Sequence, residues 1–394
     1  MAIDNKNSEK LIWLLAACCF VLGSTQQYIM GVPDQVAETL GVSLGQVSLL
    51  MTAFGLINAF FAPVIVVVTA KFPARKQLMI GLAFIIAGLL ITAFAKSFAL
   101  QLVARGLMGM GNGSFVATAY AASQKLAKPG KQATAMANVA LGFSAASVLA
   151  MPIARALRDV INWQSAYLVL AVLAVLAMLV LAKFFPNTEP DNASDSIKDR
   201  LAPLANKSVL FAYFATALMF VSYSGFYTYV TPFLDSMLPE CTDYTSLILF
   251  VLGLMSLVGT KGCGWLADRS SLRTALLFSL CGQAVMLVAV FFAECAGLGL
   301  IPVLCLFQMV AWMLVPIQNT FLSQAAGDGA RMAIALSSSF LQLGNACGAA
   351  LAGAAISSVP YSVLPLMAAP FTLVALTSEL FAFHLYKKNK AVSE

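Results

Sequence analysis

Apolar residues occur along this chain in long continuous runs that polar segments separate at regular intervals. The runs are about 18 to 24 residues long, close to the ~20 residues that a helix needs to cross ~30 Å of hydrocarbon. The shorter alternating segments of a membrane β-barrel do not occur, which favours helices. The pattern predicts twelve membrane-spanning helices, at about residues 11–32, 47–69, 77–95, 98–121, 133–154, 163–184, 209–232, 244–260, 274–293, 300–324, 332–357 and 363–385.

One long polar stretch, residues 186–207, divides these runs into two groups of six. We therefore predict an all-α membrane protein with a six-helix bundle at 1–185, a cytoplasmic linker at 186–207 and a second six-helix bundle at 208–394. Six helices on each side of a linker are typical of parallel repeats related by an axis along the membrane normal.

The composition supports a membrane location. The chain is 60% hydrophobic and only 10% charged, whereas soluble domains carry roughly 25% charged residues. The net charge of +6 could suggest nucleic acid, but most Lys and Arg residues fall at the amino terminus, in alternate loops and at the carboxyl tail. This positive-inside pattern predicts a lipid-embedded chain with both termini in the cytoplasm, and it argues against nucleic-acid binding.

Catalytic chemistry is not indicated by the sequence. Its eight cysteines show no metal-ligand spacing, no nucleophile motif is present, and the single histidine, His384, is expected near the inner membrane face. We expect no catalytic residue, no metal site and no cofactor.

The end of the first helix carries polar side chains at helical spacing. Gln26, Met30 and Asp34 repeat at i, i+4 and i+8 and so share one face of a continuous helix. The face could bind a solute, or its amide could hydrogen-bond a neighbouring helix.

A cation is predicted inside the fourth helix. Arg105 lies about 10 Å from the outer end of this helix. A charged side chain at such a depth costs at least ~2.5 kcal/mol, so it needs a function and a partner. Asp34 is the expected partner, and their pair could act as a proton-dependent switch. Glu379 falls nearer a helix end and is expected at the membrane interface.

In the second half, Phe220, Tyr223 and Tyr227 share one face of the seventh helix, and Gln308 and Trp312 lie on the tenth. Tyr223 and Trp312 are too deep for an interfacial aromatic belt, so either a solute cavity or helix packing explains them.

Small residues dominate the fifth and eleventh helices, where Gly344 and Gly348 form a GxxxG spacing. Such seams would allow the two halves to slide against each other, or they would serve static packing equally well.

The loop after the eighth helix reads GWLADRSSLR, with Gly264, Asp268, Arg269 and Arg273. A carboxylate and two guanidiniums at a cytoplasmic helix junction suit a charge relay that locks one conformation, although a solvated loop would also carry positive charge. This loop resembles the characteristic loop of the major facilitator superfamily. RGLMGMGNG, LGNACGAALAG and YIMGVPDQVAETLGVS are similar to segments of its drug/proton antiporter branch, which includes arabinose-efflux-like and purine-efflux-like carriers.

The resemblance implies alternating access around a site lined by the first, fourth, seventh and tenth helices. We expect the solute contacts to be Gln26, Met30, Arg105, Asn112, Tyr223, Tyr227, Gln308 and Trp312. Many members of the branch carry a glutamate where this chain has Gln26, and a neutral amide cannot carry an exchanged proton.

These observations predict a monomeric secondary transporter of a bacterial inner membrane that moves a small organic solute by efflux coupled to protons. One alternative is an importer or facilitator of a small organic anion without the usual proton site, favoured by Arg105 and Arg155. Another is a non-transporting receptor with a carrier fold.

Overall fold

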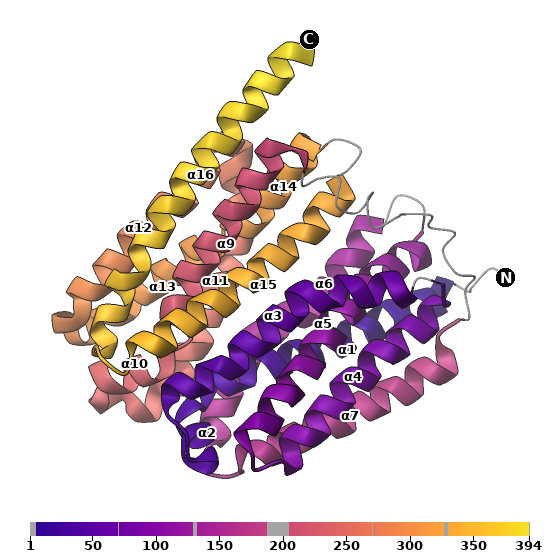
Figure 1. The fold of residues 1–394 in the computed structure, drawn as a ribbon, viewed down its shortest axis with the longest axis horizontal. Coiled ribbons are helices and arrows are strands. Elements are labelled where there is room, and N and C mark those ends of the chain that lie inside the picture. The colour runs from indigo at the N-terminus through magenta and orange to yellow at the C-terminus, as the bar shows by residue number, and fades with distance from the viewer. Residues whose placement is uncertain are drawn as a thin grey trace. The chain divides into compact units, whose positions relative to one another are not determined.

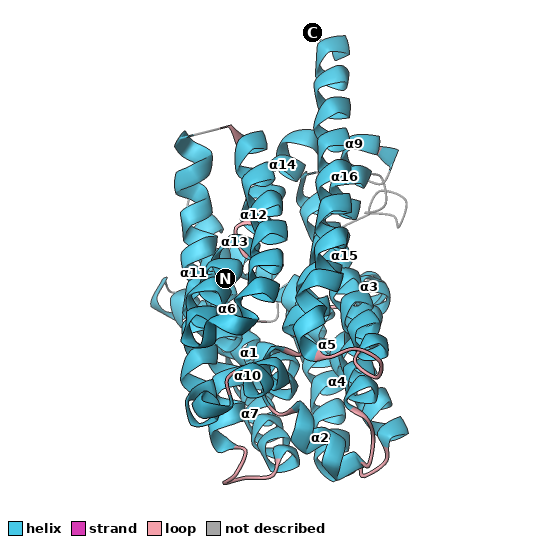
Figure 2. Cartoon of the chain, turned by 90° about the vertical axis from the view of Figure 1, so that its left-hand side faces the viewer, coloured by secondary structure: helices cyan, strands magenta, loops and turns pink. Residues whose placement is uncertain are grey.

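The computed structural model describes residues 5–69, 71–128, 132–186, 205–269, 271–326 and 330–393. Over these ranges the regular structure is entirely helical (Figure 2), which confirms the all-α part of the prediction. Most of the predicted linker, residues 187–204, lies outside the described part of the chain.

Contacts divide the chain into two compact units. Unit 1 comprises residues 1–43 and 53–194, and unit 2 comprises 44–52 and 195–394. Residues 44–52, which we expected in the first bundle, group with the second unit.

Unit 1 is built around two long helix pairs, in which α1 packs along α6 and α4 packs along α5. Helix α7 covers α4, and α1 also touches α5 and α7 (Figure 1). The helices of the first half are α1 (Asn5–Gly31), α2 (Pro33–Leu40), α3 (Leu44–Thr69), α4 (Ala74–Phe94), α5 (Phe98–Leu126), α6 (Gln132–Leu157) and α7 (Trp163–Phe184).

Unit 2 is organised around α9, which packs against both α15 and α16 (Figure 1). Asn206 caps its first turn by accepting a 3.0 Å hydrogen bond from the Ser208 backbone N–H. The α-helices of this half are α9 (Lys207–Tyr227), α10 (Val230–Met237), α11 (Thr245–Arg269), α12 (Leu272–Phe292), α13 (Leu300–Ala311), α14 (Leu314–Ala326), α15 (Ala330–Ala355) and α16 (Leu364–Ser393). Short 3₁₀ segments lie at Pro239–Tyr244, Ala293–Gly299 and Tyr361–Val363.

Two predicted crossings of unit 2 are interrupted, and proline chemistry explains both breaks. The predicted helix 300–324 divides between α13 and α14 at Trp312, four residues before Pro316. The predicted helix 209–232 likewise divides between α9 and α10, with the break at Thr228. Thr228 lies four residues before Pro232 of α10. A proline ring clashes with the carbonyl four residues earlier and provides no N–H for it, so the helix restarts with the proline in its first turn.

Within the described part of the chain, ten segments are long and apolar enough to cross a membrane. Two further predicted crossings correspond to α5, with 29 residues, and α15, with 26. Arg105, Asn112 and several glycines lower the mean hydropathy of α5. The total of twelve crossings stays a prediction.

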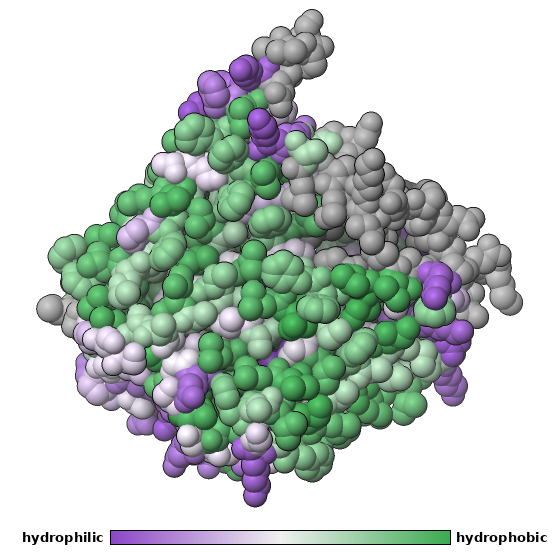
Figure 3. Space-filling model, in the orientation of Figure 1, coloured by the Kyte–Doolittle hydropathy of each residue, from purple (hydrophilic) through white to green (hydrophobic). Residues whose placement is uncertain are grey.

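Exposed surfaces of the helices are largely apolar. In Figure 3 green residues cover the sides of the helices, whereas purple residues gather near their ends. Helix α7 illustrates this pattern, because it exposes a row of large aliphatic and aromatic side chains. They are Leu168, Val169, Val172, Leu173, Val175, Leu176, Leu179, Val180 and Phe184. Lipid is the solvent that such a face requires.

The small-residue seams lie inside the units. A Cβ at Gly142 of α6 would come within 1.9 Å of the Ala16 carbonyl oxygen of α1. A Cβ at Gly348 of α15 would come within 2.4 Å of the Val221 carbonyl oxygen of α9. These glycines allow close packing of helix pairs within each unit, as the packing alternative expects, whereas sliding between the two halves stays a prediction.

Candidate functional site

Arg105 lies in the core of unit 1, where three helices meet. Its side chain is only 1% exposed. The guanidinium donates through Nη1 to the Thr25 carbonyl oxygen of α1 at 2.8 Å and through Nη2 to the Tyr167 hydroxyl of α7. The Tyr167 hydroxyl in turn donates to the same Thr25 carbonyl at 3.0 Å. The three groups form a closed hydrogen-bonded triangle that joins α1, α5 and α7.

Aromatic rings enclose this triangle. The Arg105 guanidinium carbon lies 5.1 Å from the centre of the Tyr167 ring, within the range of a cation–π interaction. Tyr167 makes edge-on contacts with Tyr28 at 5.6 Å and with Trp163 at 5.9 Å between ring centres. The charge is therefore stabilised by hydrogen bonds and ring faces from neutral residues.

The expected pairing of Arg105 with Asp34 is wrong in this structure. Helix α1 ends at Gly31, Val32 leaves the helical conformation, and Asp34 lies in the first turn of the short helix α2, where its side chain is exposed. Carboxylates are favourable in a helical first turn because of the macrodipole. The i, i+4, i+8 face also ends with α1, so it includes Gln26 and Met30 but not Asp34.

Gln26 and Asn112 are the uncharged polar site candidates of unit 1 that keep unused hydrogen-bonding capacity. Both are buried, Gln26 on α1 and Asn112 on α5. The Gln26 Oε1 and Asn112 Oδ1 atoms have no hydrogen-bond partner in the described structure. Met30 is buried on α1.

In unit 2, Tyr223 of α9 is the centre of the second group of candidates. Its hydroxyl oxygen accepts from Gln308 Nε2 at 3.0 Å and from Trp312 Nε1 at 3.1 Å. Gln308 lies in the last turns of α13, and Trp312 lies at the break that Pro316 imposes. The structure thus brings together three of the predicted residues.

Ring contacts complete this group, which we call the Tyr223 cluster: Tyr223, Tyr227, Phe307, Gln308, Trp312 and Phe220. Tyr223 stacks on Tyr227 at 5.0 Å and on Phe307 at 5.9 Å between ring centres, and its edge meets Trp312 at 6.0 Å. Phe220 also packs edge-on against Trp312, at 6.4 Å. The rings of four residues surround Tyr223. Trp312 is partly exposed, whereas Phe220, Tyr227 and Phe307 are buried.

Hydrogen-bonding groups at Tyr223 and Gln308 remain unused within the described residues. The Tyr223 hydroxyl accepts two bonds and still has its own hydrogen to donate, whereas the Gln308 Oε1 atom is buried without a partner in the described residues. Unsatisfied buried polar atoms are costly and point to a missing partner. One donor and one acceptor among aromatic rings suit a flat organic group with both functions on one edge.

The GWLADRSSLR loop is only partly described. Helix α11 continues to Arg269, but the side chains of Gly264, Asp268 and Arg269 lie outside the described residues. Arg273, in the first turn of α12, is exposed. The role of this loop as a gate stays a prediction.

Tyr167 was not among the predicted site residues, and the interfacial position predicted for Glu379 is wrong. Tyr167 follows Trp163 by one helical turn, but nothing in the sequence pairs it with Arg105. Glu379 is completely buried in α16, not interfacial as expected. An ionisable residue inside an apolar run is itself the signal that could have identified it.

The comparisons with known proteins agree with this architecture. The sequence profile described as "Major Facilitator Superfamily" matches residues 13–332. The chain belongs to this superfamily. It is 28% identical over 378 residues to the "Uncharacterized MFS-type transporter YbcL" of Bacillus subtilis, covering 96% of this chain and 97% of that protein. It is 27% identical over 363 residues to the "Inner membrane transport protein YdhP" of Escherichia coli, covering 92% and 93%.

Among solved structures, a mutant of the nucleoside transporter NupG superposes with a TM-score of 0.75, covering 95% of this chain and all of that one. At 13% sequence identity, that likeness concerns the fold alone. Major Facilitator Superfamily proteins of this kind are multi-pass membrane transporters of small solutes. The assignment to the drug/proton antiporter branch stays a prediction.

Proposed function

We propose that this protein is a secondary active transporter that exports a small, uncharged or weakly charged aromatic solute by alternating access, in exchange for protons. It works as a monomer in a bacterial inner membrane with both termini in the cytoplasm. The Tyr223 cluster carries the proposal, because it combines stacked rings with one unused donor and one unused acceptor.

The state of Arg105 supports an uncharged solute. Its Nη1 and Nη2 atoms already donate to Thr25 and Tyr167, and only the Nε atom lacks a partner. An arginine that holds an anion offers two parallel N–H groups to it. Because two of the five N–H groups of the guanidinium already join α1, α5 and α7, we assign Arg105 a positioning role rather than anion binding.

Export is supported by the sequence likeness of RGLMGMGNG and LGNACGAALAG to efflux carriers. Gln26 and Asn112 of unit 1, each with an unpartnered buried oxygen, are the further solute contacts we propose. Amide and aromatic side chains suit a flat heterocycle better than a carboxylic acid.

A second candidate function is import of a small organic anion. The observation that favours it is Arg155, a buried cation near the end of α6. The two functions require solutes of different charge, so one experiment separates them.

The test begins with a thermal-shift screen of the purified protein against purines, aromatic drugs, sugars and organic acids. We expect the stabilising compounds to be uncharged and aromatic, and Tyr223→Phe to weaken their binding while Tyr244→Phe, at an exposed tyrosine, does not. Counterflow of a labelled hit in proteoliposomes, with a pH-sensitive dye inside, then measures coupling. Hits confined to organic acids and lost in Arg155→Gln would overturn export of an uncharged solute in favour of anion import. Ligand binding without any flux would instead indicate a receptor.

A further inference from the structure

Glu379 of α16 is a buried carboxyl group that neither candidate site uses. It is 0% exposed, and its Oε2 atom accepts a 3.1 Å hydrogen bond from Gln318 Nε2 of α14. The same Gln318 nitrogen donates to the Ala212 carbonyl oxygen of α9 at 2.9 Å. The carboxyl group therefore lies where α9, α14 and α16 meet.

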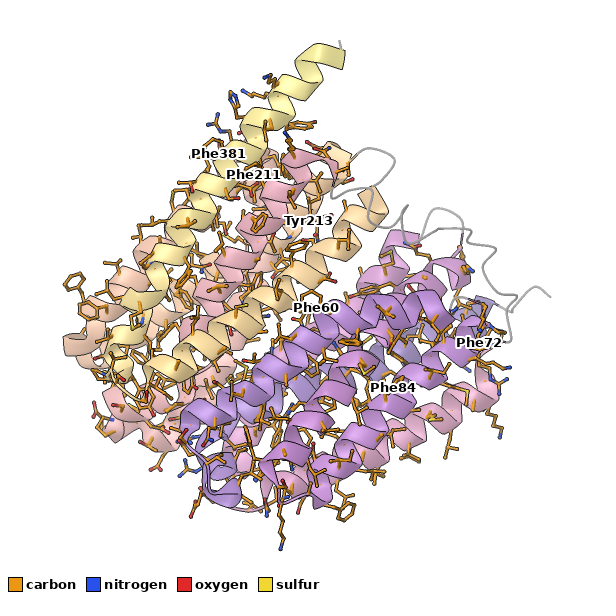
Figure 4. All side chains as sticks on the ribbon, in the orientation of Figure 1. Phe60, Phe72, Phe84, Phe211, Tyr213 and Phe381 are labelled. Carbon is orange, nitrogen blue, oxygen red and sulfur yellow. The ribbon has the colours of Figure 1, made fainter. Side chains whose placement is uncertain are left out.

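The helices around Glu379 are tied together on both sides of it. Ser378 donates to the Phe211 carbonyl oxygen at 2.7 Å, and the rings of Phe211 and Phe381 lie 5.8 Å apart (Figure 4). Towards the end of α16, Phe321 of α14 packs on Phe383 at 4.5 Å between ring centres. These contacts exclude water from the acid and hold α14 against α16.

Two buried oxygen atoms at this junction have no hydrogen-bond partner among the described residues: Oε1 of Glu379 and Oε1 of Gln318. The two groups are already joined by the bond from Gln318 Nε2 to Glu379 Oε2. A proton on Glu379 Oε1 would turn that atom into a donor, which could bond Gln318 Oε1 and close a cyclic acid–amide pair. One proton would thus satisfy both atoms.

Cations on the packed helices do not neutralise the carboxyl group. Within the described residues no ion pair joins Glu379 to a basic side chain, and the nearby lysines and arginine lie at exposed helix ends. The titratable and charged groups on the helices packed against it are Lys207, Tyr213, Tyr223 and Tyr227 of α9, Arg273 and Cys281 of α12, Tyr361, and His384, Tyr386, Lys387 and Lys388 of α16, while α14 has none. A buried ionised carboxylate without a counter-charge costs several kcal/mol, and one amide N–H offsets only part of that.

We propose that Glu379 and Gln318 form the proton-binding site of this transporter. A proton taken from water on one side of the membrane binds Oε1 of Glu379, and the same proton returns to water on the other side. While bound, it fixes α14 to α16 through the acid–amide pair, and its release leaves a carboxylate that favours separation of these helices.

The same two helices connect this site to the Tyr223 cluster. Gln318 follows Trp312 by six residues, across the break before α14. On α16, Thr372 lies two turns before Glu379 and donates to the Ser222 hydroxyl, next to Tyr223. Movement of α14 would therefore reach the solute contacts directly. In this respect the inference rests on the proposed function, whose coupling ion it locates.

Protonation is measured without any solute, by infrared difference spectroscopy of the purified protein between acidic and alkaline buffer with ¹³C-labelled glutamate. We expect a protonated-carboxyl C=O band that persists at neutral pH, is absent from Glu379→Gln and is retained in Glu240→Gln, at an exposed glutamate. Gln318→Leu, which keeps the acid but removes the amide, should shift the band. A Glu379→Gln spectrum identical to that of the unmodified protein, or an unshifted band in Gln318→Leu, would overturn the proposal.

Thermal unfolding gives an independent measurement. Because the buried group is favoured as the neutral acid, the unfolding temperature should fall by about 2 °C per pH unit as the pH rises from about 5, and Glu379→Gln should remove this slope. The exposed groups titrate equally in both proteins and cancel in the comparison. If Na⁺ at constant pH stabilises the unmodified protein but not Glu379→Gln, the site takes a metal cation and the proton assignment is wrong. Neither the infrared nor the unfolding measurement requires transport. If the export assay failed while the Glu379 infrared band was present as expected, the proposed export would be wrong and the proton-binding site would stand.

Discussion

The polar centres of the two units differ in how much of their hydrogen-bonding capacity the protein itself uses. In unit 1 the Arg105 guanidinium, the Tyr167 hydroxyl and the Thr25 carbonyl bond one another in a closed triangle, and within the described residues Nε is the one nitrogen of the guanidinium without a partner. In unit 2 the Tyr223 hydroxyl collects two bonds, yet its hydrogen and the Gln308 Oε1 atom remain unused. A closed network stabilises a bundle, whereas an open one leaves atoms for a ligand.

The largest effect on this comparison is expected from Arg105→Ala. Truncation removes the donor to the Tyr167 hydroxyl and one of the two side-chain donors to the Thr25 carbonyl, and it leaves a void in a tightly packed core. We therefore expect the free energy of unfolding to fall by about 2–4 kcal/mol. Urea or thermal unfolding in detergent measures this loss. The control is Arg158→Ala, because Arg158 is partly exposed and pairs at 3.2 Å with the exposed Asp159.

Arg105→Lys sharpens the same experiment. A lysine keeps the charge but lacks the planar fork that reaches two acceptors, so it should also destabilise the protein. If Arg105→Lys retained full stability and lost only transport, Arg105 would be a solute ligand and unit 1 would not be the closed centre described above.

Helix seams give the next largest effect. At Gly348 an added Cβ would meet the Val221 carbonyl oxygen at 2.4 Å, and backbone cannot move aside as a flexible side chain can. We expect Gly348→Ala to force α15 away from α9 and to destabilise the protein by about 1–3 kcal/mol, measured by thermal unfolding. An unchanged unfolding temperature would show that the two helices separate easily and that the seam is not a fixed contact.

In unit 2, Tyr223→Phe removes one hydroxyl and keeps the ring stacking. The indole N–H and the Gln308 amide lose their shared acceptor, so we expect a stability loss of only about 1 kcal/mol but a roughly tenfold weaker solute affinity. Isothermal titration with a hit from the thermal-shift screen measures the affinity. If the free energies of unfolding and of solute binding changed by the same amount, the Tyr223 cluster would be part of the structural core, like the Arg105 triangle of unit 1, and not a solute site.

The sequence predicted the helical fold and, except for Phe307, the residues of the Tyr223 cluster, because apolar length and the depth of polar side chains are local properties of the chain. It did not predict the partner of Arg105. A carboxylate was the electrostatic expectation, but hydrogen bonds from Arg105 to a backbone carbonyl and a tyrosine 62 residues away depend on how α1, α5 and α7 pack. Such contacts leave no mark in periodicity or charge.

Helix boundaries show the same division. The break at Trp312 follows from Pro316 by a local steric rule that was available from the sequence. The burial of Glu379 was not available in the same way, because a position near the end of an apolar run is compatible with either the interface or the core. Only the packing of α14 and Phe321 over that end of α16 decides it.

The smallest effect is expected at Gly225, which lies on α9 in the same helix pair as Gly348. An added Cβ there would meet the Gly348 carbonyl oxygen at 3.8 Å and the Ala368 Cβ at 3.9 Å, both ordinary van der Waals distances. Replacing a helical glycine by alanine lowers the backbone entropy of the unfolded chain, so Gly225→Ala should stabilise the protein by about 0.5–1 kcal/mol. Thermal unfolding of Gly225→Ala and Gly348→Ala, measured side by side, makes them a matched pair. Each variant adds one methyl group to the same helix pair, and the changes in unfolding temperature should have opposite signs. If Gly225→Ala were also destabilising, α9 would lie closer to α15 and α16 than these distances allow.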